Sequence, residues 1–147
     1  MAPDRPRLGD PDVDAIRVMW DDESEYFLVR VEVPEEAGFA GRVLANFATV
    51  LAWDDVAMLA AGVVNHAARS TDLGGYSYDM APHGDVVVYD GGDHEVQVSG
   101  PAFHRFMARW LDALIAGGET ATDPAMAAPW WPQLRATADA IRALATS

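Results

Sequence analysis

The histidines are the residues of this chain whose chemistry first suggests a metal site. His83 and His94 lie close in sequence to Asp85 and Asp93, and imidazole nitrogens and carboxylate oxygens are common zinc ligands. We expect His94 to lie opposite Tyr89 in a hairpin, and Tyr89 follows His83 by six residues along its strand. A rise of about 3.3 Å per residue then separates the two imidazoles by roughly 20 Å, too far for one ion. No metal site is therefore predicted. The four histidines are His66, His83, His94 and His104.

Nucleophilic and acid–base catalysis have no recognisable motif either. The serines lie in predicted loops or at the C-terminus, outside any G-x-S-x-G turn, and the carboxylate pairs are adjacent in sequence, which does not bring them together on one proton. These pairs are Asp21-Asp22, Glu35-Glu36 and Asp54-Asp55. The glycine pairs at 74–75, 91–92 and 117–118 lack phosphate-binding frames, and all ten basic residues are arginine, which excludes a Walker-type loop. We expect no catalytic residue and no cofactor.

Acidic residues beside aromatic ones form the pattern that points to binding. The segment 20–26, WDDESEY, places four carboxylates between Trp20 and Tyr26, and a second predicted hairpin tip carries further acids. Aromatic anchors beside charged residues are typical of protein interfaces. The candidate partner-binding residues are Trp20, Asp21, Asp22, Glu23, Glu25, Tyr26, Asp90, Asp93 and Glu95. In the competing interpretation, Trp20 and Tyr26 cap the core and the acids only solvate a turn.

The net charge narrows the class of partner. The 147 residues include 23 acidic and 10 basic ones, for a net charge of −13. Such a chain repels nucleic acid and attracts cationic proteins, although an acidic surface can also serve only to prevent aggregation. No apolar stretch is long enough for a membrane span or a signal peptide. Because cysteine is absent, we expect a reducing, cytoplasmic location.

The N-terminal half predicts one hairpin followed by helices. Apolar residues alternate over 16–20 and 26–33 around a four-residue polar loop, with Phe27, Val29, Val31 and Val33 on one face. Residues 38–69 show helical spacing and are expected to form two packed helices or one bent helix, with Asp54 as a possible N-cap. A short strand is predicted at 76–78. Residues 1–12 show no period and are expected to form a flexible leader.

The C-terminal half predicts a hairpin that leads into the best helix of the chain. If Gly91-Gly92 form a two-residue turn, Tyr89 lies opposite His94 and Val87 opposite Val96. The core face is then Val87, Tyr89, Val96 and Val98. Ser99 is expected to cap a helix that ends at Gly117-Gly118. A turn at Asp123-Pro124 and a terminal helix through Leu134, Ala138, Ile141 and Ala145 complete a single α+β domain over 13–147, in which antiparallel hairpins pack against amphipathic helices.

The build of the chain resembles the immunity proteins that neutralise bacterial polymorphic toxins. The resemblance lies in a small, acidic, cysteine-free α+β domain whose hairpin, Asp85 to Val98, leads into an amphipathic helix. The apolar stripe of that helix includes Phe103, Phe106, Trp110 and Leu114. The resemblance implies a non-enzymatic inhibitor that covers a basic protein partner, such as a toxin domain, with an acidic surface.

Two other functions stay open at this point. In the first, a small-ligand protein or minor enzyme has a pocket between the sheet and the helices, with His94 as general base. The residues that would line this pocket are Trp53, Tyr76, Tyr78, Tyr89, His94 and Trp110. In the second, the chain is a subunit of a larger assembly and Trp130-Trp131 is exposed until it meets a neighbour.

Overall fold

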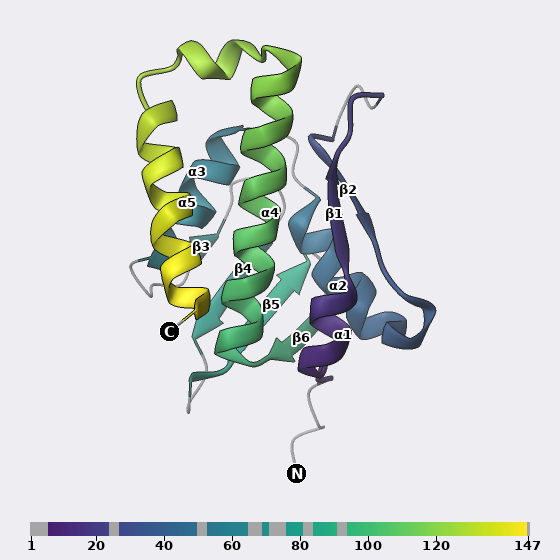
Figure 1. Cartoon of the computed structure of the whole chain (residues 1–147). Coiled ribbons are helices and arrows are strands. Elements are labelled where there is room, and N and C mark those ends of the chain that lie inside the picture. The colour runs from purple at the N-terminus through teal and green to yellow at the C-terminus, as the bar shows by residue number, and fades with distance from the viewer. Residues whose placement is uncertain are drawn as a thin grey trace.

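In the part of the chain that it describes, a computed structural model shows two antiparallel sheets and five α-helices (Figure 1). The structure describes residues 6–23, 27–49, 53–64, 69–70, 76–80, 84–90 and 94–146. The α+β class predicted from the sequence is confirmed. The elements are α1 (Asp10–Ala15), β1 (Arg17–Trp20), β2 (Val29–Glu32), the 3-10 helix η1 (Glu35–Ala37), α2 (Gly38–Ala48), α3 (Trp53–Val64), β3 (Arg69–Ser70), β4 (Tyr76–Met80), β5 (Val86–Asp90), β6 (Glu95–Val98), α4 (Gly100–Ala121), the 3-10 helix η3 (Pro124–Ala127) and α5 (Trp131–Thr146).

The long helix α4 is the centre of the fold. It contacts α5, α3 and α1 as well as β1, and Figure 1 shows it between α5 and the β1–β2 ribbon. Ser99 caps it as predicted, because its side chain accepts a hydrogen bond from the Ala102 N–H at 3.1 Å. The predicted apolar stripe is buried, with Phe103, Phe106, Met107, Trp110, Leu111 and Leu114 each at most 1% exposed.

The predicted end of this helix at Gly117-Gly118 is wrong. Both glycines are helical and buried, and α4 continues to Ala121, where Thr122 adopts a left-handed φ of 54°. A Cβ built at Gly117 would lie 2.2 Å from the ring of Trp20. The glycines are therefore explained by close packing of indoles on the helix backbone, and the cost of helical glycine is offset by that packing.

The register predicted for the C-terminal hairpin is also wrong, by one residue. Val88 lies opposite Val96, and Asp90 N–H donates to the His94 carbonyl at 3.3 Å, so three residues rather than two connect the strands. A one-residue slip exchanges the two faces of a strand. Val86 and Val88 are accordingly fully buried together with the predicted core residues Val96 and Val98, while Tyr89 is only partly buried. Val87 is nevertheless buried as predicted, at 3% exposure.

The N-terminal hairpin is confirmed, but its connection is longer than expected. Trp20 lies opposite Val29, so residues 21–28 join the strands instead of a four-residue loop. Phe27 therefore falls outside β2 and is 43% exposed, whereas it was predicted to share the buried face with Val29. The buried face of the ribbon packs on α4 and α2.

Residues 38–64 form two helices rather than one. Asp54 lies inside the first turn of α3 and is not the residue before it, so the predicted cap position is shifted. No single helix in the described part of the chain is long and apolar enough to span a membrane. The bent pair Glu35–Ala48 and Trp53–Val64 satisfies that test of length and composition only when its two halves are combined.

The expected flexible leader is packed over its described part. Leu8 is 4% exposed, its N–H donates to the Gln97 carbonyl at 3.0 Å, and α1 begins at Asp10. The predicted boundary at Val13 therefore falls within a helix, because Leu8 and Val13 both bury apolar surface. At the other end, Trp131 is buried in the predicted terminal helix, α5.

Candidate functional site

Two residues of the predicted aromatic pocket, Tyr78 and Trp110, belong to the hydrophobic core. Tyr78 and Trp110 are fully buried, and the polar group of each side chain donates a hydrogen bond to a backbone carbonyl. The Tyr78 hydroxyl donates to Leu59 at 3.2 Å, and the Trp110 indole N–H donates to Ala48 at 2.9 Å. Satisfying these buried donors stabilises the fold and leaves them no role toward a ligand.

The other four pocket residues lie in two places. Trp53 stacks on Trp20 at a centroid distance of 6.0 Å, whereas the His94 side chain is 52% exposed and packs edge-on against Phe39 at 5.0 Å. In the register of the sheet, Tyr76 and His94 lie on either side of Asp90, next to Tyr89. Tyr89 is partly buried, and the side chain of Tyr76 lies outside the described structure. His94 Nδ1 lies 3.3 Å from the Asp90 carboxylate.

Four tryptophans from distant elements form one cluster over the glycine pair of α4. Trp53 contacts Trp20, Trp130 and Trp131, with centroid distances between 5.2 and 6.3 Å. Trp20 is therefore a core cap, as the competing interpretation held, and not an exposed anchor. Trp130 is partly buried in the same cluster, so Trp130-Trp131 does not stand exposed for a neighbouring subunit.

The two predicted acidic loops do not form one surface. Figure 1 shows the tip of the β1–β2 ribbon at the top of the molecule, well separated from the β4–β5–β6 sheet in the lower half. The Asp90 side chain is only 6% exposed and accepts a hydrogen bond from Asn46 at 3.4 Å, so it is a structural acid. Glu95 is partly buried. Glu25, Tyr26 and Asp93 lie outside the described residues.

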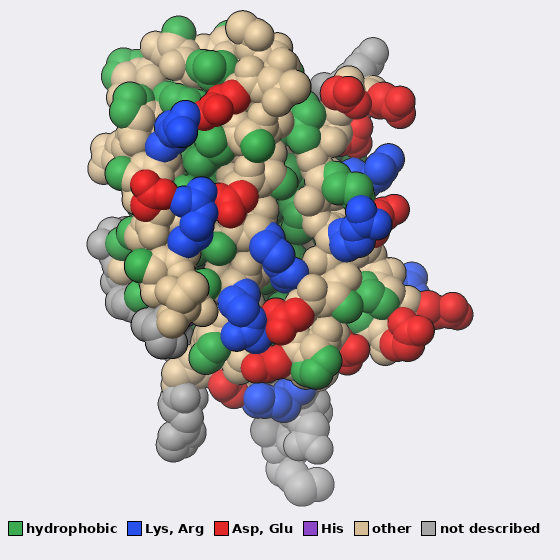
Figure 2. Space-filling model, viewed as in Figure 1, with side chains coloured by type: hydrophobic (Ala, Val, Ile, Leu, Met, Phe, Trp, Pro, Cys, Tyr) green, Lys and Arg blue, Asp and Glu red, His purple; other side chains and the backbone are tan. Residues whose placement is uncertain are grey.

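Three arginines of α4 and α5 form ion pairs with carboxylates of the same chain. Arg105 binds the Asp14 carboxylate at 3.0 Å, Arg142 pairs with Asp112 and Asp139, and Arg135 pairs with Glu119. The hydrogen bond that Arg105 donates to Asp14 raises the pKa of Arg105, and the one that Arg142 donates to Asp112 raises the pKa of Arg142. These cations therefore neutralise carboxylates on the α1–α4–α5 face, where Figure 2 shows the two charges side by side.

Four carboxylates at the two ends of the β1–β2 ribbon are not neutralised by any described cation. Asp22 and Glu23 at the tip of the β1–β2 ribbon, and Glu35 and Glu36 at its other end, are exposed and form no ion pair with any described residue. We call these four residues the acidic edge. The right-hand margin of Figure 2 shows carboxylates gathered at these two ends. Between them, Arg17 and Glu32 pair at 3.6 Å.

Two exposed phenylalanines accompany the acidic edge, and the sequence reading missed both as surface residues. Phe27 in the ribbon connection is 43% exposed, and Phe39 in the first turn of α2 is 55% exposed. Phe39 lies four and eight residues before Val43 and Phe47, which places it on the apolar stripe by spacing alone. Its ring instead packs edge-on against His94, with the centroids 5.0 Å apart, a tertiary contact that no local pattern indicates.

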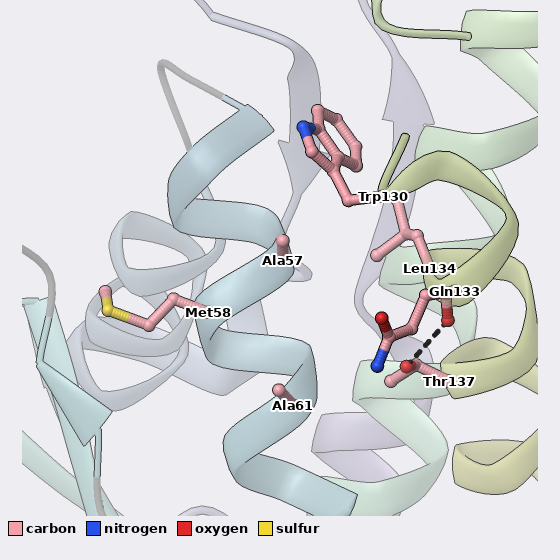
Figure 3. Close-up of a pocket in the computed structure, with 7 residues that line it drawn as sticks. All are labelled: Ala57, Met58, Ala61, Trp130, Gln133, Leu134 and Thr137. Atoms are coloured by element: carbon pink, nitrogen blue, oxygen red, sulfur yellow. Dashed lines mark hydrogen bonds between the residues drawn. The ribbon is translucent and has the colours of Figure 1, made fainter. Parts of the chain in front are cut away.

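Several hollows open on the described surface, and two of them are lined by residues of β2 or of the tryptophan cluster. One, of about 460 Å³, lies between β2 and α2 next to the acidic edge and is lined by Val31, Val33, Pro34, Glu35, Gly38, Arg42, Ala45, Asn46 and Thr49. The other, of about 320 Å³, lies between α3 and α5, where Figure 3 shows Trp130 and Gln133 facing the small side chains of Ala57 and Ala61. The second hollow holds no charged side chain among its lining residues.

Neither a metal site in the described residues nor a matching protein suggests a function. Among the residues that the structure describes, no three histidine, aspartate or glutamate side chains converge as a metal site. No protein-family model, curated protein or solved structure matches the chain. The function must therefore be argued from the charge, shape and contacts of this surface.

Proposed function

We propose that this chain is a non-enzymatic binding protein of the immunity or inhibitor type, which neutralises a basic protein partner by docking it on the acidic edge. One observation carries the proposal: the four exposed carboxylates of the acidic edge lack cation partners among the described residues, whereas five carboxylates of the α1–α4–α5 face pair with arginines, namely Asp10, Asp14, Asp112, Glu119 and Asp139. The acidic edge therefore presents exposed negative charge at both ends of the β1–β2 ribbon. The proposal places the protein in the cytoplasm, in line with its cysteine-free composition.

Long-range attraction is the physical advantage of this arrangement. Carboxylates without internal counter-ions act on an approaching cationic surface over about 10 Å at ordinary salt, and such steering raises association rates on the order of 10- to 1,000-fold. The partner is expected to present clustered arginine or lysine. An acidic surface covering a basic active site inhibits by occlusion, and no chemistry by this chain is required.

The exposed rings supply the short-range part of the interface. Phe27 lies in the same connection as Asp22 and Glu23, and Phe39 follows Glu35 and Glu36. The eight residue steps from Phe27 to Glu35 span at most about 28 Å, which is comparable with the width of a typical interface footprint of about 800 Å² per partner. Aromatic residues at such positions are the usual energetic anchors of an interface.

Differential capture tests this proposal. The intact chain and two double variants, each changing the net charge by the same amount, are used as bait in a lysate of the source organism. Asp22→Lys with Glu23→Lys reverses the ribbon tip, while Asp54→Lys with Asp79→Lys reverses two exposed acids of α3 and β4. We expect a stoichiometric basic protein on the wild type and on the α3–β4 variant, released by high salt and missing from the tip variant. Equal capture by both variants, or capture of no basic protein, contradicts the proposal.

A further inference from the structure

The hollow between β2 and α2 contains two opposite charges that do not pair with each other. Glu35 of η1 and Arg42 of α2 both line it and are both exposed, yet neither forms an ion pair with any residue that the structure describes. Five described arginines elsewhere, Arg105 with Asp14 among them, bind carboxylates directly, whereas Arg30 and Arg109 form no ion pair with a described residue. An acceptor and a donor held apart in one concave site form a receptor for a ligand that carries both charges.

Local backbone geometry holds Glu35 and Arg42 apart. Gly38 joins η1 to α2 with a φ of 62° and a ψ of −149°, a conformation that L residues rarely adopt. A Cβ built at Gly38 would meet no atom within 4 Å, so the floor of the hollow at this residue is open. The chain direction changes here, which places Glu35 at one side of the hollow and the second turn of α2 at another.

Asn46 also lines the hollow, and a hydrogen bond to Asp90 fixes the orientation of its side-chain amide. Its side-chain nitrogen donates to the Asp90 carboxylate at 3.4 Å, and an ionised carboxylate only accepts hydrogen bonds. The amide must therefore direct its nitrogen to Asp90, which leaves its oxygen as the group free to accept. The Asp90 side chain, at 6% exposure, is held in this position by the fold.

We infer that this hollow binds a free α-amino acid with an apolar side chain. Glu35 and the Asn46 oxygen would accept hydrogen bonds from the ammonium group, and the Arg42 guanidinium would donate to the α-carboxylate. Val31, Val33 and Pro34 supply an apolar wall for the side chain. The volume of about 460 Å³ lies within the range of roughly 300 to 1,000 Å³ usual for small-molecule sites.

A lone cation or a lone anion fits this site less well than a zwitterion. A small cation held inside the hollow would meet Arg42 as well as Glu35, and a small anion held inside it would meet Glu35 as well as Arg42. Like charges in one site cost binding energy, whereas a ligand with both charges satisfies both side chains. The inference does not depend on the proposed partner protein, because the isolated chain is sufficient to test it.

Calorimetric titration of the intact chain with L-leucine, N-acetyl-L-leucine and L-leucinamide tests the inference. We expect saturable binding of leucine, and affinity weaker by about tenfold or more for both analogues, since each lacks one charge. Absence of leucine binding at millimolar concentration overturns the inference, as does equal affinity for all three compounds.

Matched variants locate the site. Glu35→Gln and Arg42→Gln are each expected to weaken leucine binding by about tenfold or more. Asp79→Asn and Arg30→Gln remove exposed charges outside the hollow and are expected to bind leucine as the wild type does. Unchanged binding in both hollow variants overturns the assignment. Circular dichroism of each variant confirms folding, and the two analogues test the inference on the wild-type chain alone.

Discussion

The ring of Trp20 in β1 lies directly on the backbone of Gly117 in α4, so close that a Cβ at that glycine would be 2.2 Å from the Trp20 Cγ. This contact holds the β1–β2 ribbon against α4. The tip of the ribbon carries Asp22 and Glu23 of the acidic edge. The neighbouring Gly118 gives room to the indoles of Trp53 and Trp131. The orientation of the acidic edge therefore depends on two glycines far away in sequence.

Gly117→Ala is expected to destabilise the protein by about 1–3 kcal/mol. The added methyl group overlaps the Cβ, Cγ and Cδ2 atoms of Trp20, and this strain exceeds the gain of about 1 kcal/mol from alanine's helix propensity. Urea unfolding followed by tryptophan fluorescence measures the change. Gly118→Ala is the control, because its Cβ would meet only the far ends of two indoles at 3.0–3.3 Å. A Gly117→Ala variant as stable as the wild type would rule out the packing explanation.

Ser99→Ala is expected to cost about 1 kcal/mol of stability. The variant loses the cap on the Ala102 N–H and the hydrogen bond of the Ser99 hydroxyl to Asp10 at 2.7 Å. Ser99→Asn retains a capping side chain and is expected to recover most of the loss. Thermal unfolding of the three proteins provides the comparison, and identical midpoints for all three would show that the cap contributes nothing.

Arg109→Met is expected to destabilise the domain by about 1–3 kcal/mol. The guanidinium donates to the carbonyls of Val13 and Asp14 at 3.0 and 2.9 Å and so joins the end of α1 to α4. The guanidinium is partly removed from water where it makes these bonds, and this burial lowers the pKa of Arg109. Arg109→Lys is expected to recover only part of the stability, because a single ammonium does not reproduce the planar fork. Chemical denaturation measures both variants, and full recovery by lysine would contradict this geometry.

Reversal of Asp22 and Glu23 to lysine is expected to slow association with the captured partner by about tenfold or more, with a smaller change in dissociation. Asp21 is left unchanged, since its carboxylate accepts the Glu23 N–H at 3.0 Å and shapes the turn. Surface plasmon resonance at several salt concentrations measures both rates. The wild-type association rate should fall steeply with salt and the variant rate much less. Salt-independent association of the wild type would remove electrostatic steering from the proposed function.

The sequence determined the elements whose signals are local. The spacing of Phe103, Phe106, Trp110 and Leu114 predicted the central helix, and Ser99 predicted where it begins, because helix periodicity and capping involve residues only a few positions apart. Alternating apolar residues likewise predicted both hairpins. The α+β class followed from these elements.

Only the tertiary structure decided the register, the helix end and the site. The three-residue connection after Asp90 slips the hairpin by one position, and Gly117 continues a helix because Trp20, 97 positions earlier, packs on it. The same holds for the charges. Asp14 is neutralised by Arg105, 91 positions away, whereas Asp22 and Glu35 have no ion-pair partner among the described residues. A carboxylate has the same chemistry in every sequence, but its charge is available to a partner only where the fold brings no internal cation beside it.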